Sequence, residues 1–170
     1  MAAGATYNPI ATTTLGSAAS SITFTGISQS YTDLVCILKC EQTTTSNINM
    51  RVGNGSIDTG ANYSSTVMDG DGGSVYAASS VYANNNQMNI DYWAASGDKM
   101  KFATINIPNY SNTTTYKHSL IRLGGEDREV AFIVSSWRNT AAINQIQIYP
   151  SGGGNMKAGS IVTIYGIAAA

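Results

Sequence analysis

Short segments in which apolar and polar residues alternate recur along the whole chain, with small-residue turns between them. One such segment near the start runs from Leu15 to Ile27, and another near the end runs from Gly159 to Ile167. Alternation with a period of two is typical of β-strands, because successive side chains point to opposite faces of a sheet. The pattern therefore predicts an all-β protein that these two segments bracket.

About eight strands are expected. They are predicted at residues 22–24, 34–40, 48–52, 102–107, 120–123, 130–134, 143–148 and 161–167. Glycine- and asparagine-rich turns separate them, as at Gly53-Asn54-Gly55, Asn84-Asn85-Asn86 and Gly152-Gly153-Gly154. Strands of this number and spacing favour a two-sheet antiparallel sandwich with a jelly-roll-like arrangement. The nearly continuous apolar run at 34–40 predicts a strand that is covered on both faces.

Two stretches lack a clear strand signal. Residues 54–90 are rich in Gly, Ser, Asn and Tyr, and we expect long loops there with one or two short strands. Residues 1–13 are rich in Ala, Gly and Thr, and we expect an N-terminal arm followed by a single domain at 14–170. Because the predicted strands come so close to both ends, we expect a self-contained unit without an anchor or shaft.

The composition disfavours several function classes. Only 11% of the residues are charged and the net charge is −1, so the chain offers no basic stripe for nucleic-acid phosphates. The first residues lack a signal peptide and no run approaches 18 apolar residues, so we expect neither conventional secretion nor a membrane span. The mixed-sign cluster Glu126-Asp127-Arg128-Glu129 follows two glycines, which predicts a solvated hairpin loop.

The two cysteines, Cys36 and Cys40, lie four residues apart in an apolar run. On a strand they share a face, but their Cα atoms are then roughly 13 Å apart. A disulfide requires a Cα separation below about 7 Å. We therefore expect two buried free thiols, consistent with folding in a reducing cytosol.

No catalytic set is visible, and we expect no enzyme, no cofactor and no metal site. His118 is the only histidine, and a surface histidine is favoured over a general base. The carboxylates are scattered singly. Asp69-Gly70-Asp71-Gly72-Gly73 has the alternate spacing of calcium loops, but it lacks the remaining ligands, so a plain turn is favoured over a bound cation.

Carbohydrate binding is the one ligand hypothesis that the residues support. Aromatic residues near predicted loops could stack on sugar rings: Tyr63, Tyr76, Tyr82, Tyr92, Trp93, Tyr110 and Trp137. Aromatic residues at sheet ends more often cap a core or contact another subunit. Both interpretations stay open, and no individual contact residue is predicted for a glycan or protein partner.

A series of weak motifs in a fixed order adds a family resemblance. After the Leu15–Ile27 segment come Tyr31-Thr32-Asp33-Leu34-Val35, Arg51-Val52-Gly53-Asn54-Gly55, Asn62-Tyr63-Ser64, Ile105-Asn106-Ile107-Pro108-Asn109-Tyr110, Trp137 with Ala142-Ile143-Asn144-Gln145-Ile146, and Gly159-Ser160-Ile161-Val162-Thr163-Ile164-Tyr165-Gly166-Ile167. Over residues 7–167 this order resembles the small β-sandwich virion proteins of cyanophages and other tailed phages.

The resemblance implies a non-enzymatic virion component that is made in the host cytoplasm and assembled onto the particle. We expect a capsid decoration (cement) protein that binds the major capsid protein or other virion proteins and stabilises the shell. Self-association is also expected, with a trimer favoured by the threefold symmetry common in phage particles. The alternative is a tail-fibre or tail-attached host-recognition subunit that binds a cell-surface glycan or protein.

Overall fold

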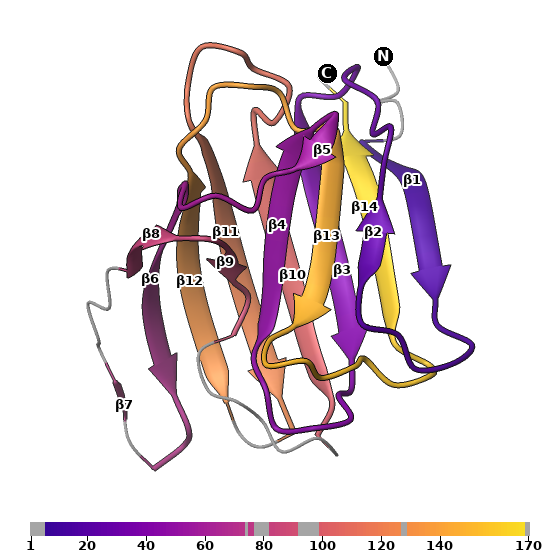
Figure 1. The fold of residues 1–170 in the computed structure, drawn as a ribbon, viewed down its shortest axis with the longest axis vertical. Coiled ribbons are helices and arrows are strands. Elements are labelled where there is room, and N and C mark those ends of the chain that lie inside the picture. The colour runs from indigo at the N-terminus through magenta and orange to yellow at the C-terminus, as the bar shows by residue number, and fades with distance from the viewer. Residues whose placement is uncertain (1–5, 74, 77–81, 92–98, 127–128, 169–170) are drawn as a thin grey trace.

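Two antiparallel β-sheets lie face to face, and their strands account for most of the described chain (Figure 1). The structure is a computed structural model that describes residues 6–73, 75–76, 82–91, 99–126 and 129–168. The described residues contain fourteen strands and no helix. A membrane-spanning helix is therefore absent from this part of the chain. The all-β, two-sheet antiparallel fold expected from the sequence is confirmed.

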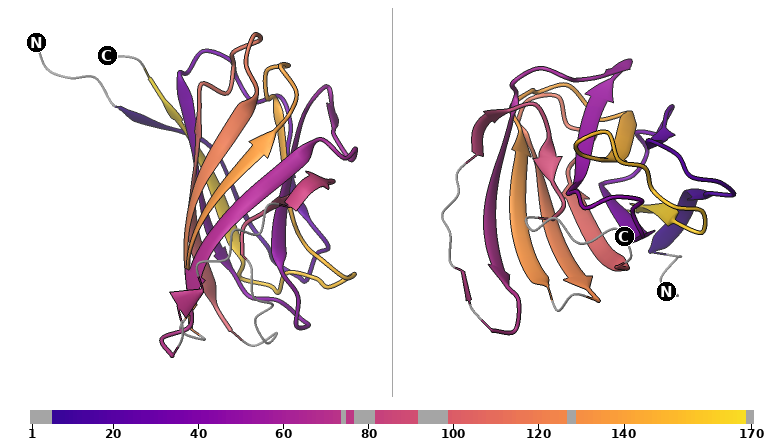
Figure 2. Two further views of the ribbon diagram at one scale, coloured as in Figure 1. Left: turned by 90° about the vertical axis from the view of Figure 1, so that its left-hand side faces the viewer. Right: turned by 60° about the horizontal axis from the view of Figure 1, so that its bottom comes forward.

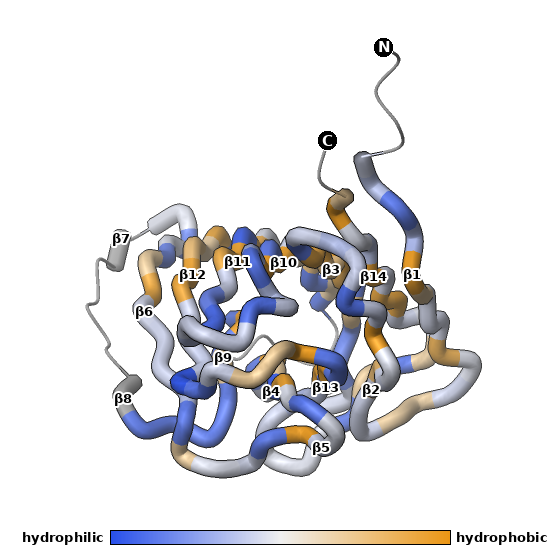
Figure 3. Tube along the Cα trace, turned by 90° about the horizontal axis from the view of Figure 1, so that it is seen from above, coloured by the Kyte–Doolittle hydropathy of each residue, from blue (hydrophilic) through white to orange (hydrophobic). Residues whose placement is uncertain are grey.

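The larger sheet has nine strands within the described residues. Its order is β1 (Tyr7–Thr14), β14 (Ile161–Ile167), β3 (Asp33–Cys40), β10 (Lys101–Pro108), β11 (Lys117–Gly125), β12 (Val130–Trp137), β6 (Tyr63–Gly70) and β7 (Val75–Tyr76), with β8 (Tyr82–Asn85) also paired to β6. Figure 3 shows this sheet from above as one row that faces the smaller sheet.

The smaller sheet has five strands among the described residues. Its order is β2 (Ile22–Phe24), β13 (Gln145–Pro150), β4 (Ile48–Asn54) and β5 (Ser56–Ile57), with β9 (Met88–Asn89) paired to β4. The two sheets are seen edge-on in the left view of Figure 2. Apolar side chains from both inner faces fill the space between them, among them Ile105 and Ile133 of the larger sheet and Met50 and Ile148 of the smaller.

Every strand predicted from the alternation is present, but two long strands were not expected. Residues Tyr7–Thr14, assigned to an arm, form β1 and pair with β14 at the sheet edge. An edge strand tolerates Pro9, and the register shifts by one residue between Pro9 and Ala11. The second is β6, an eight-residue strand inside the stretch expected to be mostly loops.

The cysteines behave as expected. Cys36 and Cys40 are buried free thiols on the core-facing side of β3. Burial raises the pKa of Cys36 to about 12 and that of Cys40 to about 11, because the thiolate form loses its hydration. The expectation that β3 is covered on both faces holds only in part: on the side away from the core Val35 is buried, but Ile37 is half-exposed.

Candidate functional site

The outer face of the larger sheet, which points away from the smaller sheet, carries large apolar side chains in contact with solvent. Seven such residues, which we name the outer apolar face, are Ile37, Met68, Phe102, Leu120, Val130, Phe132 and Val134. Met68 is 63% exposed and Phe132 is 58% exposed. The solvated face of an antiparallel sheet is ordinarily polar. A contiguous apolar patch of this kind typically marks an interaction surface.

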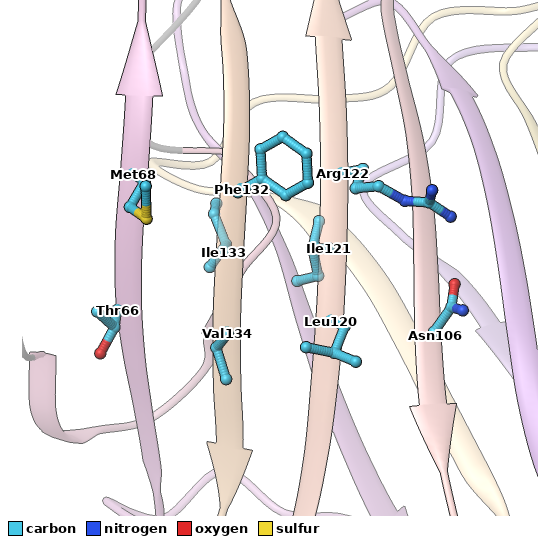
Figure 4. A pocket seen from close by; sticks show the side chains of 9 residues that line it. All are labelled: Thr66, Met68, Asn106, Leu120, Ile121, Arg122, Phe132, Ile133 and Val134. Atoms are coloured by element: carbon cyan, nitrogen blue, oxygen red, sulfur yellow. The ribbon is translucent and has the colours of Figure 1, made fainter. Parts of the chain in front are cut away.

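Strand register places several of these residues next to one another although they come from different strands. Phe132 of β12 is paired with Met68 of β6 on one side and with Arg122 of β11 on the other. In the next row of the same face, Val134 is paired with Leu120. Figure 4 shows these two rows on adjacent strands, with Phe132 level with Met68 and Leu120 level with Val134. They surround a hollow of about 450 Å³ on the outer side of the sheet.

Three polar residues, Thr66, Asn106 and Arg122, also line this hollow and interrupt the apolar surface. Arg122 is exposed, and within the described residues its guanidinium makes no hydrogen bond or ion pair. Asn106 of β10 lines the same hollow, and its Oδ1 is buried without a hydrogen-bond partner among the described residues. A partner on this face therefore meets five guanidinium donors and one unsatisfied acceptor within an apolar surround.

His118 also lies on the outer face, at the end of the sheet beyond Leu120. Its imidazole is exposed, and Nδ1 is 2.8 Å from Oγ of Ser136 on the neighbouring strand. A surface histidine was expected, and that expectation is confirmed. Its hydrogen-bond partner is a hydroxyl rather than the carboxylate that would orient a general base.

Three of the aromatic residues proposed for sugar stacking are not available as a surface platform. Tyr63, Tyr110 and Trp137 are buried in the core. The Tyr63 hydroxyl donates to the carbonyls of Val52 and Asp58, and that of Tyr110 donates to the carbonyl of Ser28. These residues cap the core at the sheet ends. Tyr76 lies in β7 and Tyr82 in β8, while Tyr92 and Trp93 lie outside the described residues.

A polar pocket lies at one end of the sandwich, beside β5. It has a volume of about 350 Å³ and is lined by hydroxyl, amide and carboxylate groups of Asn54, Ser56, Asp58, Thr59 and Asn139, with Trp137 beneath. Trp137 Nε1 and Asn62 Nδ2 each donate to Asp58 Oδ2 at 2.8 Å, and the Gly60 amide donates to Oδ1. Burial raises the pKa of Asp58, but these hydrogen bonds outweigh it and hold the pKa below its ordinary value.

The loop with calcium-like spacing does not gather its carboxylates. Asp69 is the last inward-facing side chain of β6, whereas Asp71 is exposed and accepts a hydrogen bond from the Gly73 amide in the turn. Among the described residues, no three His, Cys, Asp or Glu side chains form a group that could hold a metal ion.

Three charged side chains are buried together at the opposite end of the sandwich, and sequence reasoning missed this cluster. Lys101 Nζ lies 2.6 Å from Asp91 Oδ2 and 2.8 Å from Glu129 Oε2. Glu129 was expected in a solvated loop, and that expectation was wrong: its carboxylate points inward and pairs with Lys101. The signal was present in the sequence, because Lys101 is in phase with Ala103, Ile105 and Ile107, which face the core.

No family model matches the chain, and no curated protein matches it. Among solved structures, similarity is found to CG-16, a homodimeric agglutinin from chicken liver (10% identity, 85% of this chain and 98% of that chain, TM-score 0.36). The CBM40 of Ruminococcus gnavus IT-sialidase, bound to alpha2,6 sialyllactose, is 10% identical over 96% of this chain and 95% of that chain, with a TM-score of 0.42. A human SPRY domain is 8% identical over 92% and 97%, with a TM-score of 0.30.

Proposed function

We propose that this protein is a non-enzymatic virion component of a tailed phage, and that it decorates the assembled capsid and stabilises it. The virion setting rests on the sequence resemblance described above. The observation that carries the binding mode is the outer apolar face, where Met68, Phe132 and Leu120 lie half-exposed on adjacent strands. The partner that we propose for this face is the major capsid protein.

The size of the outer apolar face suits a protein partner. Seven large side chains that are about half-exposed leave roughly 700 Å² of apolar surface, more than the largest patch on most monomers. A standard protein interface buries about 800 Å² on each partner. Covering this face would therefore account for most of one such interface.

The polar groups within the outer apolar face favour binding to a specific partner over non-specific hydrophobic association. The Arg122 guanidinium can receive a carboxylate or backbone carbonyl of the partner, and Asn106 Oδ1 can accept a donor. Each group costs free energy if it is buried without a partner. A capsid surface that supplies an acceptor for Arg122 and a donor for Asn106 would therefore bind more tightly than a surface that is only apolar.

The test uses particles that lack this protein. Added purified protein should bind such shells and raise the temperature at which they rupture or release DNA. Phe132→Ser should weaken binding at least tenfold. Tyr116→Ser removes a comparably exposed aromatic ring outside the outer apolar face and should bind like wild type. Equal rupture temperatures with and without bound protein would contradict the stabilising role.

The second candidate is a tail-attached host-recognition subunit, and the polar end pocket is the observation that favours it. Its hydroxyl, amide and carboxylate groups are the kinds of side chain that bind sugar hydroxyls. Binding of the purified protein to host cells or to a glycan array, lost in Asn139→Ala, would support this function instead. The trimer and the position on the particle stay predictions. Sedimentation equilibrium of the purified protein tests the trimer, and electron microscopy of particles with labelled copies tests the position.

A further inference from the structure

The buried cluster of Lys101, Asp91 and Glu129 brings an amine against two carboxyl groups inside the sandwich. The side chains are 1%, 0% and 3% exposed, respectively. Asp91 follows β9 of the smaller sheet, Lys101 opens β10 of the larger sheet, and Glu129 directly precedes β12. The cluster therefore lies where the two sheets approach each other, away from the end pocket but next to Phe102 and Val130 at the edge of the outer apolar face.

Burial makes the fully ionised state of this cluster costly. One ammonium and two carboxylates carry a net negative charge in a site without water contact, and desolvation penalises each ion. Burial is the main reason that the pKa of Asp91 is raised to about 7, against the opposing effect of the Lys101 charge. Near neutral pH, Asp91 is thus available as a neutral carboxylic acid beside the lysine nitrogen.

The contacts around Asp91 resemble those of an acyl-transfer site. Lys101 Nζ is held 2.6 Å from Oδ2, while the backbone N–H of Ile48 donates to Oδ1 at 2.9 Å. That N–H can stabilise negative charge on Oδ1 when the carboxyl carbon becomes tetrahedral. Glu129 Oε2, 2.8 Å from Nζ, is placed to take a proton from the amine. Fixed positions of this kind replace an encounter in solution.

We propose that Lys101 and Asp91 join spontaneously in an intramolecular isopeptide bond, with Glu129 as the proton shuttle. Burial lowers the pKa of Lys101, but the contacts with Asp91 and Glu129 outweigh it and raise that pKa, so Glu129 first takes a proton from the ammonium. The neutral amine then attacks Cγ of Asp91 and forms the N–C bond. Glu129 returns its proton to the departing Oδ2 hydroxyl and accepts a second proton from Nζ. The C–O bond breaks, and one water molecule leaves. The reaction involves no change in oxidation state and requires no co-reactant.

The bond would link the two sheets covalently. Asp91 is held to β4 through the Ile48 amide, and Lys101 belongs to β10. A cross-link between the layers resists their separation under heat or force, which non-covalent packing alone does not. Formation of this bond does not require that the protein be a virion component.

The direct test is the mass of the purified full chain, measured under denaturing conditions after folding. The proposal predicts a mass lower than the sequence mass by one water molecule. Trypsin should then yield a branched peptide in which residues 52–99 are joined through Asp91 to residues 100–117, because modified Lys101 is not cleaved. An unmodified chain mass, with free cleavage after Lys101, would overturn the proposal and leave a non-covalent ion cluster.

Variants separate the chemistry from folding. Glu129→Gln should fold, as judged by circular dichroism, yet keep the full mass or lose water at least tenfold more slowly. Asp91→Ala and Lys101→Arg should never lose water. Lys117→Arg is the matched control: Lys117 is also buried, but its Nζ donates to the carbonyls of Thr115 and Thr140, so the water loss should persist. Water loss that is equally fast in folded Glu129→Gln would contradict the shuttle role.

Discussion

Phe132 and Ile133 are neighbours in β12, yet their side chains lie on opposite sides of the larger sheet: Ile133 is buried in the core and Phe132 is mostly exposed. The strand is apolar on both faces, although only one face is covered in the isolated chain. Strands of this kind occur where a second layer covers the sheet. Ile133 therefore stabilises the fold, whereas Phe132 is exposed and available for contact with a partner.

Alanine substitutions at these two positions should have different effects on the free energy of unfolding. Ile133→Ala deletes buried methyl groups and should cost about 2–5 kcal/mol. Phe132→Ala should change stability by about 0.5 kcal/mol or little more, because its ring contacts solvent. Urea denaturation of both variants measures the difference. Equal losses would mean that Phe132 is a core residue and that the outer apolar face is misassigned.

Gly166 should be intolerant of a side chain. A Cβ at this position would overlap the ring of Tyr31, which packs over β14. Gly166→Ala should therefore cost about 1–3 kcal/mol by overpacking. The matched control is Gly124→Ala, where a Cβ meets nothing within 4 Å. In a Tyr31→Ala background the cost of Gly166→Ala should largely disappear, and a cost that persists would show that another contact is responsible.

Asp58 should make stability depend on acid pH. Hydrogen bonds from Trp137, Asn62 and Gly60 outweigh burial and lower its pKa in the folded state. A lowered pKa stabilises the fold above the unfolded value of about 3.9, and the contribution is lost as the pH falls through the folded value. Asp58→Asn should thus be destabilising at neutral pH, with a deficit that shrinks as the pH falls below the unfolded pKa of about 3.9. A deficit that is constant across this range contradicts the assignment.

The two thiols should be inert in the folded protein. With pKa values raised to about 12 for Cys36 and about 11 for Cys40, almost no thiolate exists near pH 8. A chromogenic disulfide reagent should therefore titrate neither cysteine in the native protein and both in denaturant. Rapid reaction of either thiol without denaturant would show that the larger sheet opens at β3.

The sequence predicted the strand segments whose inward residues are all apolar and missed β6, whose inward residues are half polar. In β6 the inward side chains are Tyr63, Ser65, Val67 and Asp69, so half of the expected hydrophobic signal is absent. The Ser65 hydroxyl lies 2.7 Å from Ser135 Oγ across the sheet, and it also accepts a hydrogen bond from the backbone N–H of Asn89. Ser135 lies 70 residues away in the chain, and local periodicity contains no information about it.

The candidate sites differ in how far the sequence could reveal them. The run Val130-Ala131-Phe132-Ile133-Val134 is apolar at both parities, which already indicates a strand that is apolar on both faces. The phase of Lys101 and Glu129 with their core-facing neighbours similarly indicates buried charges. Their meeting with Asp91 depends on the packing of two sheets, which alternation within one strand does not specify.

Oxidation of Met68 by peroxide is the most direct test of the outer apolar face as the capsid-binding surface. In the free protein Met68 is exposed, while Met50, Met88 and Met156 are fully buried, so Met68 should oxidise much faster than these three. On decorated shells we expect Met68 to be protected at least tenfold, as read by peptide mass spectrometry, with the buried three unchanged. Equal oxidation of Met68 in free and shell-bound protein would contradict docking through this face.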